Sequence, residues 1–225
     1  EMSASLVGSE MCIRDRDFGM PKFEIKIRWI LIAILLPCII KGIYVLIFNG
    51  EYVSSNMNGN EIFNTLSAGV AFTGIAAGFV EEMVFRGVIL NALKKRWDMK
   101  VAVIVPSMLF GIVHVLGQDF SIGSCLLVII AGTMVGVMFS MIAIESGSVW
   151  NSGIVHAIWN IVIIGGGLAI GEKMDPYSVM TYVLDSKVFA ITGGEFGIES
   201  SVISLIGYII VAGIAFIMIK SNRKN

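Results

Sequence analysis

Residues 29–48 read WILIAILLPCIIKGIYVLIF, an apolar run of 20 residues that contains one charged side chain, Lys41. A helix of about 20 apolar residues is what the hydrocarbon core of a bilayer requires. No small-residue cleavage site follows the run, so we interpret it as a membrane span and not as a cleaved signal peptide.

The whole chain has the composition of a membrane protein. Of its 225 residues, 56% are apolar and only 15% are charged, against about 25% charged in soluble domains. The net charge of −1 provides no basic field for nucleic acid, so we expect no nucleic-acid partner. Cys12, Cys38 and Cys125 show no metal or redox spacing and are interpreted as packing residues.

Charged residues divide the remaining chain into further apolar segments, each near the length that crosses a bilayer. The six segments are 29–48, 62–93, 101–116, 124–144, 149–170 and 201–219. The second is too long for one simple span and is expected to tilt or to extend into the interface. The predicted fold class is therefore all-α, a polytopic bundle of about six transmembrane helices. Small-residue pairs at Gly74/Gly78 and Gly132/Gly136 permit close helix contacts.

Basic residues orient the predicted spans. They precede the first segment, fill the connection 94–100 and end the chain, whereas the loop 51–61 has none. The excess of Lys and Arg marks the cytoplasmic side, so both termini are expected there. The acidic loop 171–199 is then outside. We expect an integral protein of a prokaryotic cell membrane, with the lipid bilayer as its first partner.

The first 16 residues, EMSASLVGSEMCIRDR, differ in composition from everything that follows. We interpret residues 1–16 as a non-native leader, similar to translated adapter sequence, and exclude them from the fold. Met20 is then the expected start. Residues 17–225 are expected to form a single transmembrane helical domain.

Few polar side chains that can ionise or donate strong hydrogen bonds lie within the predicted spans, where such residues are costly and are often functional. They are Lys41, Glu81, Glu82, Arg86, His114, His156 and the amide of Asn160. Lys41 is isolated and can extend to the interface, so we assign it a structural role. At a rise of about 1.5 Å per residue, Glu81 and His114 each lie roughly 20 Å from the basic connection between their segments. Comparable depth predicts one shared polar site.

Helical spacing sorts these residues into pairs. Glu82 and Arg86 are four residues apart, so they share a helix face and can form an ion pair. His156 and Asn160 share a face in the same way. Glu81 points about 100° away from Glu82 and has no partner in the sequence. A purely structural role, with a buried bridge and packed histidines, is the alternative for the whole set.

The chemistry that these side chains support is hydrolysis. A buried carboxylate can act as a general base towards water, and histidine and amide groups can stabilise an oxyanion. The same Glu81, His114 and His156 could instead bind a divalent metal such as zinc, whose bound water would attack, as in a metalloprotease. The HExxH motif of many zinc proteases is absent from the sequence.

In these residues the chain resembles the CPBP family of intramembrane proteases, which includes type II CAAX prenyl endopeptidases and bacterial self-immunity proteins. Three motifs carry the resemblance over residues 61–167. EExxxR is present as EEMVFR at 81–86, FxxxH as FGIVH at 110–114, and HxxxN as HAIWN at 156–160. All three occur in the order found in the family, on separate predicted spans.

The resemblance implies roles for each motif residue. Glu81 with His114 would activate the attacking water, His156 and Asn160 would form the oxyanion site, and Glu82 with Arg86 would brace them. The predicted function is an intramembrane endopeptidase that hydrolyses a peptide bond of a membrane-associated protein or peptide. The alternative is a non-catalytic immunity or scaffold protein of the same fold. A proton-coupled transporter ranks last, because no repeated halves are visible.

Overall fold

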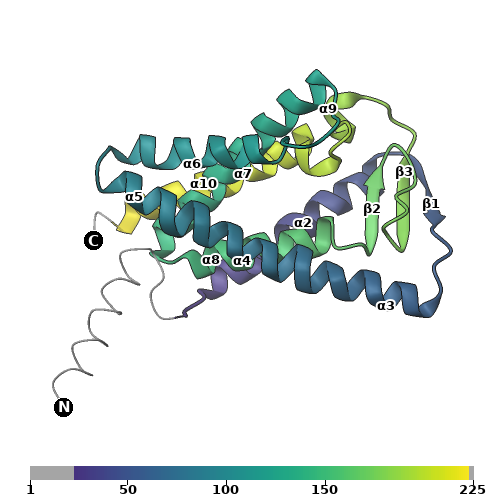
Figure 1. Ribbon diagram of the computed structural model, residues 1–225, viewed down its shortest axis with the longest axis horizontal. Coiled ribbons are helices and arrows are strands. Elements are labelled where there is room, and N and C mark those ends of the chain that lie inside the picture. Colours follow the sequence, from purple (N-terminus) through teal and green to yellow (C-terminus); the bar gives the residue numbers. More distant parts are fainter. Residues whose placement is uncertain (1–22, 223–225) are drawn as a thin grey trace, which may run out of the picture.

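The helices run alongside one another, and the strands gather at one end of the bundle (Figure 1). The computed structural model describes residues 23–222. Its long helices are α2 (Ile27–Ile47), α6 (Met99–Val113), α7 (Ile122–Ser146), α8 (Val149–Ile163) and α10 (Val202–Asn222). Between α2 and α6, one continuous helical stretch comprises α3 (Gly59–Ala68), η1 (Gly69–Ala76), α4 (Ala77–Glu82), η2 (Met83–Ile89) and α5 (Leu90–Lys94). The short α9 (Phe189–Thr192) and η3 (Ile198–Ser200) precede α10.

Two π-helical segments interrupt the continuous stretch from α3 to α5. It begins with a capping box, in which the Asn58 side chain accepts from the Glu61 N–H and the Glu61 side chain accepts from the Asn58 N–H. Both η1 and η2 are π-helical, and they flank α4. Such wide turns occur frequently at functional sites. The predicted acid pair, Glu81 and Glu82, lies on the short α-helical segment between them.

Glycines allow the helices to approach closely, as the small-residue spacing predicts. A Cβ on Gly78 would lie 2.8 Å from the Cα of Ala157 on α8, and one on Gly74 would also meet α8. On α7, a Cβ on Gly132 would lie 2.6 Å from the Cα of Gly111 on α6. These distances are shorter than real side chains accept, so both contacts require glycine.

One buried carboxylate fixes three helices at the same end of the bundle. Glu145, near the end of α7, accepts hydrogen bonds from Arg28 and Trp29 at the start of α2 and from Asn222 at the end of α10. The connection of residues 94–100 lies at this end too (Figure 1). We call it the basic end, because it carries most of the Lys and Arg side chains of the bundle.

The opposite end, which we call the loop end, carries a three-stranded sheet in the order β1–β3–β2. Its strands are β1 (Gly50–Ser54), β2 (Leu168–Gly171) and β3 (Met180–Leu184). β1 pairs with β3 antiparallel, so that Tyr52 lies opposite Tyr182 with ring centroids 4.8 Å apart, and β2 pairs with β3 parallel. The all-α prediction is wrong in this respect, because the four- and five-residue strands form only by pairing across distant parts of the chain.

The fifth apolar segment also differs from its prediction as a helix over 149–170. α8 ends at Ile163, and residues 165–167 are three glycines. Gly166 has a φ of 80°, in the left-handed region where a side chain would be strained. The chain therefore turns there and continues as β2.

Helix lengths support a helical membrane bundle. Within the described residues, four helical stretches are long and apolar enough to cross a membrane: Ile27–Ile47, Gly59–Lys94, Ile122–Ser146 and Val202–Asn222. The apolar α6 and α8 have 15 residues each, fewer than the about 20 of a simple span. Six spans with two cytoplasmic termini stay a prediction. The predicted leader 1–16 and the start at Met20 lie outside the described residues.

Lys41 has contacts that match a structural role. Its ammonium group donates to the carbonyls of Val162 at the end of α8 and Leu168 in β2. These bonds satisfy a charge inside an apolar helix and connect α2 to the turn between α8 and the sheet. Lys41 does not line the cavity described below.

The glycine contact between α6 and α7 makes a stability prediction. Gly132→Ala should lower the free energy of unfolding by about 1–3 kcal/mol, because the new methyl overlaps the Gly111 backbone. Gly42→Ala is the matched control, since a Cβ there meets no atom within 4 Å, and it should leave stability unchanged or raise it by up to about 1 kcal/mol. Unfolding in mixed micelles measures both. Equal effects of the two substitutions would contradict the packing argument.

Candidate active site

Glu82 and Arg86 form a fully buried ion pair. Arg86 Nη1 lies 2.8 Å from Glu82 Oε1, one helical turn apart, and both residues are 0% exposed. Arg86 also donates through Nη2 to the Gly136 carbonyl at 2.8 Å and through Nε to Ser140 Oγ at 3.4 Å. The pair predicted from the sequence is thus present, and its arginine connects η2 to α7.

Aromatic rings enclose the arginine. The guanidinium carbon of Arg86 lies 4.7 Å from the ring centroid of Phe110 and 5.3 Å from that of Phe139. A cation is attracted to the face of an aromatic ring, most strongly where water is excluded. The FxxxH motif therefore contributes its Phe110 to the charged pair and its histidine to the neighbouring cavity.

His156 is held between the two glutamates. Its Nδ1 lies 3.2 Å from Glu82 Oε1, and its Nε2 lies 3.8 Å from Glu81 Oε2. The imidazole stacks on Phe139 with centroids 4.5 Å apart and ring planes at 19°. Because Arg86 and Glu82 are paired, Nδ1–H is the hydrogen that donates to Glu82, which leaves Nε2 facing Glu81.

Two carboxylate oxygens near His156 lack hydrogen-bond partners. Glu81 Oε2 and Glu82 Oε2 are buried, and among the described residues they have no donor within reach. An unpaired carboxylate oxygen in an apolar surrounding binds a water or a proton strongly. Glu81 is the one of the two that lines a cavity.

His114 follows the last residue of α6, and the backbone of the preceding turn orients its ring. Its Nδ1 lies 2.6 Å from the Phe110 carbonyl, which can only accept, so Nδ1 carries the hydrogen in the neutral ring. Nε2 is then free to accept a hydrogen bond. The ring contacts Phe110 and Phe196, with centroids 4.6 and 6.1 Å away.

Asn160 lies one turn beyond His156 on α8 and contacts the π-helical segment. Its Nδ2 donates to the Thr73 carbonyl in η1 at 2.9 Å. The second hydrogen of the same amide has no protein acceptor among the described residues. The bond fixes the amide, so that its remaining N–H has a defined direction.

One cavity of about 160 Å³ unites most of the predicted site. Glu81, His114, His156 and Asn160, from three separate helical stretches, line this cavity, the candidate catalytic cavity. Glu82 and Arg86 do not line it and contact His156 from behind. The structure thus separates the six predicted residues into four that face the cavity and two that support them.

The sequence analysis missed several residues of the cavity wall. Thr73, Phe196, Glu199 and Tyr208 line it as well. Burial raises the pKa of the Glu199 carboxyl, in η3 at the loop end, to about 8. Glu199 gave no signal in the sequence, because a single acid in an acidic loop is indistinguishable from a solvated charge.

The side-chain arrangement was also compared with the needs of a metal ion. Among the described residues, no group of three or more His, Cys, Asp or Glu side chains is placed to hold one. Catalytic zinc requires three protein ligands at about 2.0–2.3 Å from the ion. Glu81, His114 and His156 do not fit that requirement as they stand, and no reaction step below involves a metal.

The buried pair predicts a large loss on removal of one partner. Arg86→Met should lower the free energy of unfolding by about 3–5 kcal/mol, because Glu82 is left charged and buried. Adding Glu82→Leu should recover part of that loss. Arg96→Met, an exposed arginine, should cost less than about 1 kcal/mol. Unfolding in mixed micelles measures these changes. If Arg86→Met lowered the free energy of unfolding as little as Arg96→Met, the structural role of the Glu82–Arg86 pair would be contradicted.

Comparison with known proteins supports the motifs. A family model described as type II CAAX prenyl endopeptidase, Rce1-like, matches residues 63–162. No curated protein and no solved structure matches the chain. The matched segment contains EExxxR, FxxxH and HxxxN together with the helices that carry them. Residues 63–162 are therefore similar to the CAAX-type proteases of the CPBP family, and the apolar helices indicate an integral membrane protein.

Proposed function

We propose that the protein is an intramembrane endopeptidase that hydrolyses a peptide bond of a membrane-associated peptide or protein through a water activated by Glu81 and His114. One observation carries the proposal: a glutamate, two histidines and an asparagine from three separate helical stretches line the same small cavity. Buried polar groups with a structural role are usually hydrogen-bonded, whereas Glu81 Oε2 makes no hydrogen bond and has His156 Nε2 3.8 Å away.

Water activation is the first step. A water between Glu81 and His114 transfers a proton to the Glu81 carboxylate as its oxygen bonds to the carbonyl carbon of the scissile peptide group. His114 Nε2 accepts the second hydrogen of that water and so directs its lone pair. When the C–N bond breaks, Glu81 returns the proton to the leaving amine, and the carboxylate is restored.

Two residues of α8 would stabilise the oxyanion that forms on the scissile carbonyl. The free N–H of Asn160 donates to the carbonyl oxygen as it gains negative charge, and His156 donates from Nε2 when that nitrogen carries a hydrogen as well as Nδ1. Removing one such donor typically costs about 10²- to 10³-fold in kcat. Glu82 and Arg86 act as positioning residues, since they hold His156 Nδ1 and so fix which nitrogen faces the cavity.

The membrane placement follows from charge. We propose that the basic end is cytoplasmic, that six helices cross a prokaryotic cell membrane, and that the loop end is outside. The bilayer and a peptide substrate within or next to it are the partners. A non-catalytic immunity or scaffold protein is the competing function, and it predicts that Glu81 has no role beyond folding.

The catalytic role of Glu81 can be tested in cells and then with purified protein. New peptide amino termini in a membrane proteome, present with wild-type protein and absent with Glu81→Gln, identify cleavage sites. With a peptide spanning such a site, Glu81→Gln should reduce kcat by about 10²- to 10⁴-fold, since the general base is lost. Glu51→Gln, an exposed acid in β1, is the matched control and should retain full activity. Undiminished cleavage by folded Glu81→Gln would contradict the role of Glu81 as general base, and the absence of cleavage by folded wild-type protein would support the non-catalytic alternative.

Metal dependence has its own test. If side chains alone activate the water, dialysed protein should keep full activity in the presence of a chelator. Elemental analysis should then find less than about 0.1 transition metal ion per chain, whereas a zinc site would give about one. A stoichiometric metal whose removal abolishes cleavage would replace this mechanism with the metalloprotease alternative.

A further inference from the structure

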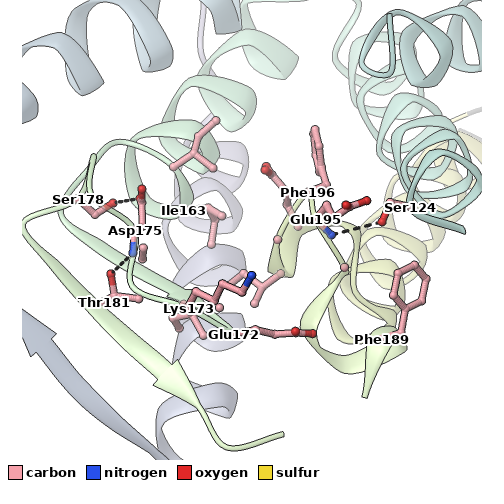
Figure 2. Close-up of a pocket in the computed structure, with 18 of the residues that line it drawn as sticks. Ser124, Ile163, Glu172, Lys173, Asp175, Ser178, Thr181, Phe189, Glu195 and Phe196 are labelled. Atoms are coloured by element: carbon pink, nitrogen blue, oxygen red, sulfur yellow. Dashed lines mark hydrogen bonds between the residues drawn. The ribbon is translucent and has the colours of Figure 1, made fainter. Parts of the chain in front are cut away.

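A second, larger cavity opens at the loop end. It has a volume of about 640 Å³. Figure 2 shows two facing walls: Glu172, Lys173 and Asp175 come from the connection between β2 and β3, and Glu195 and Phe196 come from the segment before η3. Lys173 extends its amino group into the space between them. We call this space the outer cavity.

The outer cavity adjoins the catalytic cavity. Ile164, Phe196 and Glu199 line both of them. Phe196 also contacts the catalytic ring of His114 edge to face, with centroids 6.1 Å apart. A chain that passes from one cavity to the other therefore passes these three side chains.

The two volumes suit different parts of a peptide. Binding cavities for small ligands measure about 300–1,000 Å³. The catalytic cavity, at about 160 Å³, has room for a water and the scissile peptide group only. The residues next to the scissile bond need an adjoining space, and the outer cavity lies within the usual range for a ligand site.

We propose that the outer cavity binds a hydrophilic, positively charged segment of the peptide substrate, adjacent to its scissile bond. This inference rests on the proposed protease function and adds the substrate class. All its lining residues except Ser121 and Ser124 lie outside the matched residues 63–162. The specificity is therefore a property of this chain's own loops.

The charge of the wall favours a cation, because fixed acids outnumber the single Lys173. Glu172 accepts from Thr192 Oγ1 at 2.6 Å, and Asp175 accepts from Ser178 Oγ at 2.5 Å. These hydrogen bonds hold the carboxylates in place before a substrate arrives, so the side chains lose less conformational freedom on binding.

Two more acids complete the wall, and they differ in charge. Glu195 accepts from the Ser121 N–H at 2.7 Å, and this bond lowers the pKa of the Glu195 carboxyl. It is therefore ionised at neutral pH. Glu199, with its raised pKa, is largely neutral there. A basic side chain in the outer cavity thus faces the carboxyl groups of Glu172, Asp175 and Glu195 and one ammonium group, a complementary field.

Site-directed labelling tests the position of the substrate. In a background with Cys12, Cys38 and Cys125 replaced by serine, Lys173→Cys is treated with a bulky maleimide. Asp185→Cys is the matched control, because Asp185 is exposed at the loop end and lines neither cavity. Relative to each variant's unlabelled activity, labelling at 173 should reduce kcat/KM at least tenfold. Labelling at 185 should change it less than twofold.

A binding measurement complements the kinetics. The peptide that spans an identified cleavage site should slow maleimide labelling at 173 severalfold and leave labelling at 185 unaffected. A version with lysine next to the scissile bond should have a kcat/KM about tenfold above a version with glutamate there. Full activity after labelling at 173, no protection by the peptide, or equal cleavage of the two peptides would overturn the inference. Failure of the protease proposal is distinct, because it appears as the absence of cleavage by wild-type protein or as unchanged cleavage by Glu81→Gln.

Discussion

The ion pair of Glu82 and Arg86 is the constraint on which the site depends. In an apolar interior a charge must find its partners within the protein. Arg86 satisfies this need with Glu82 on its own helix and with Gly136 and Ser140 on α7, and Glu82 adds His156 on α8. One charge pair thus sets the relative positions of three helices. Any shift that moves His156 away from Glu82 also removes a partner from a buried charge. The electrostatic interactions therefore favour the same position of His156 that the proposed chemistry needs.

Two adjacent glutamates consequently have opposite tasks. Glu82 binds Arg86 and His156 and does not line the cavity. Glu81 points about 100° away from it round the helix and lines the cavity, where its Oε2 makes no hydrogen bond. Close packing makes this division effective. Gly78 brings α4 against Ala157, one residue after His156, and this contact places the imidazole within reach of both carboxylates. A carboxylate without a hydrogen-bond partner in a cavity is suited to act as a general base towards water.

The sequence alone revealed the parts of the site that carry an unusual signal. Charged residues within apolar segments are costly. Glu81, Glu82 and Arg86 can therefore be recognised as unusual without knowledge of the exact helix boundaries. Glu199 and Phe196 carry no such signal, since an acid and a ring in a polar loop are ordinary and only folding places them over the cavity. The strands were missed because their pairing joins residues 50–54 to 180–184. The end of α8 was missed because the glycines 165–167 look merely apolar in a hydropathy count.

The shortness of α6 and α8 has a consequence for how water reaches the site. At about 1.5 Å per residue, 15 residues cover roughly 22 Å, less than the about 30 Å hydrocarbon thickness of a bilayer. Such hydrophobic mismatch is relieved by thinning of the surrounding lipid. Of these two helices, α6 presents exposed apolar side chains such as Ile104, Met108 and Ile112, whereas α8, which carries His156 and Asn160, is enclosed by the bundle. With α6 as one of the proposed spans, the membrane would be thin beside His114, the residue that follows α6, and a substrate helix that drifts there would lose part of its lipid cover before it meets the protein.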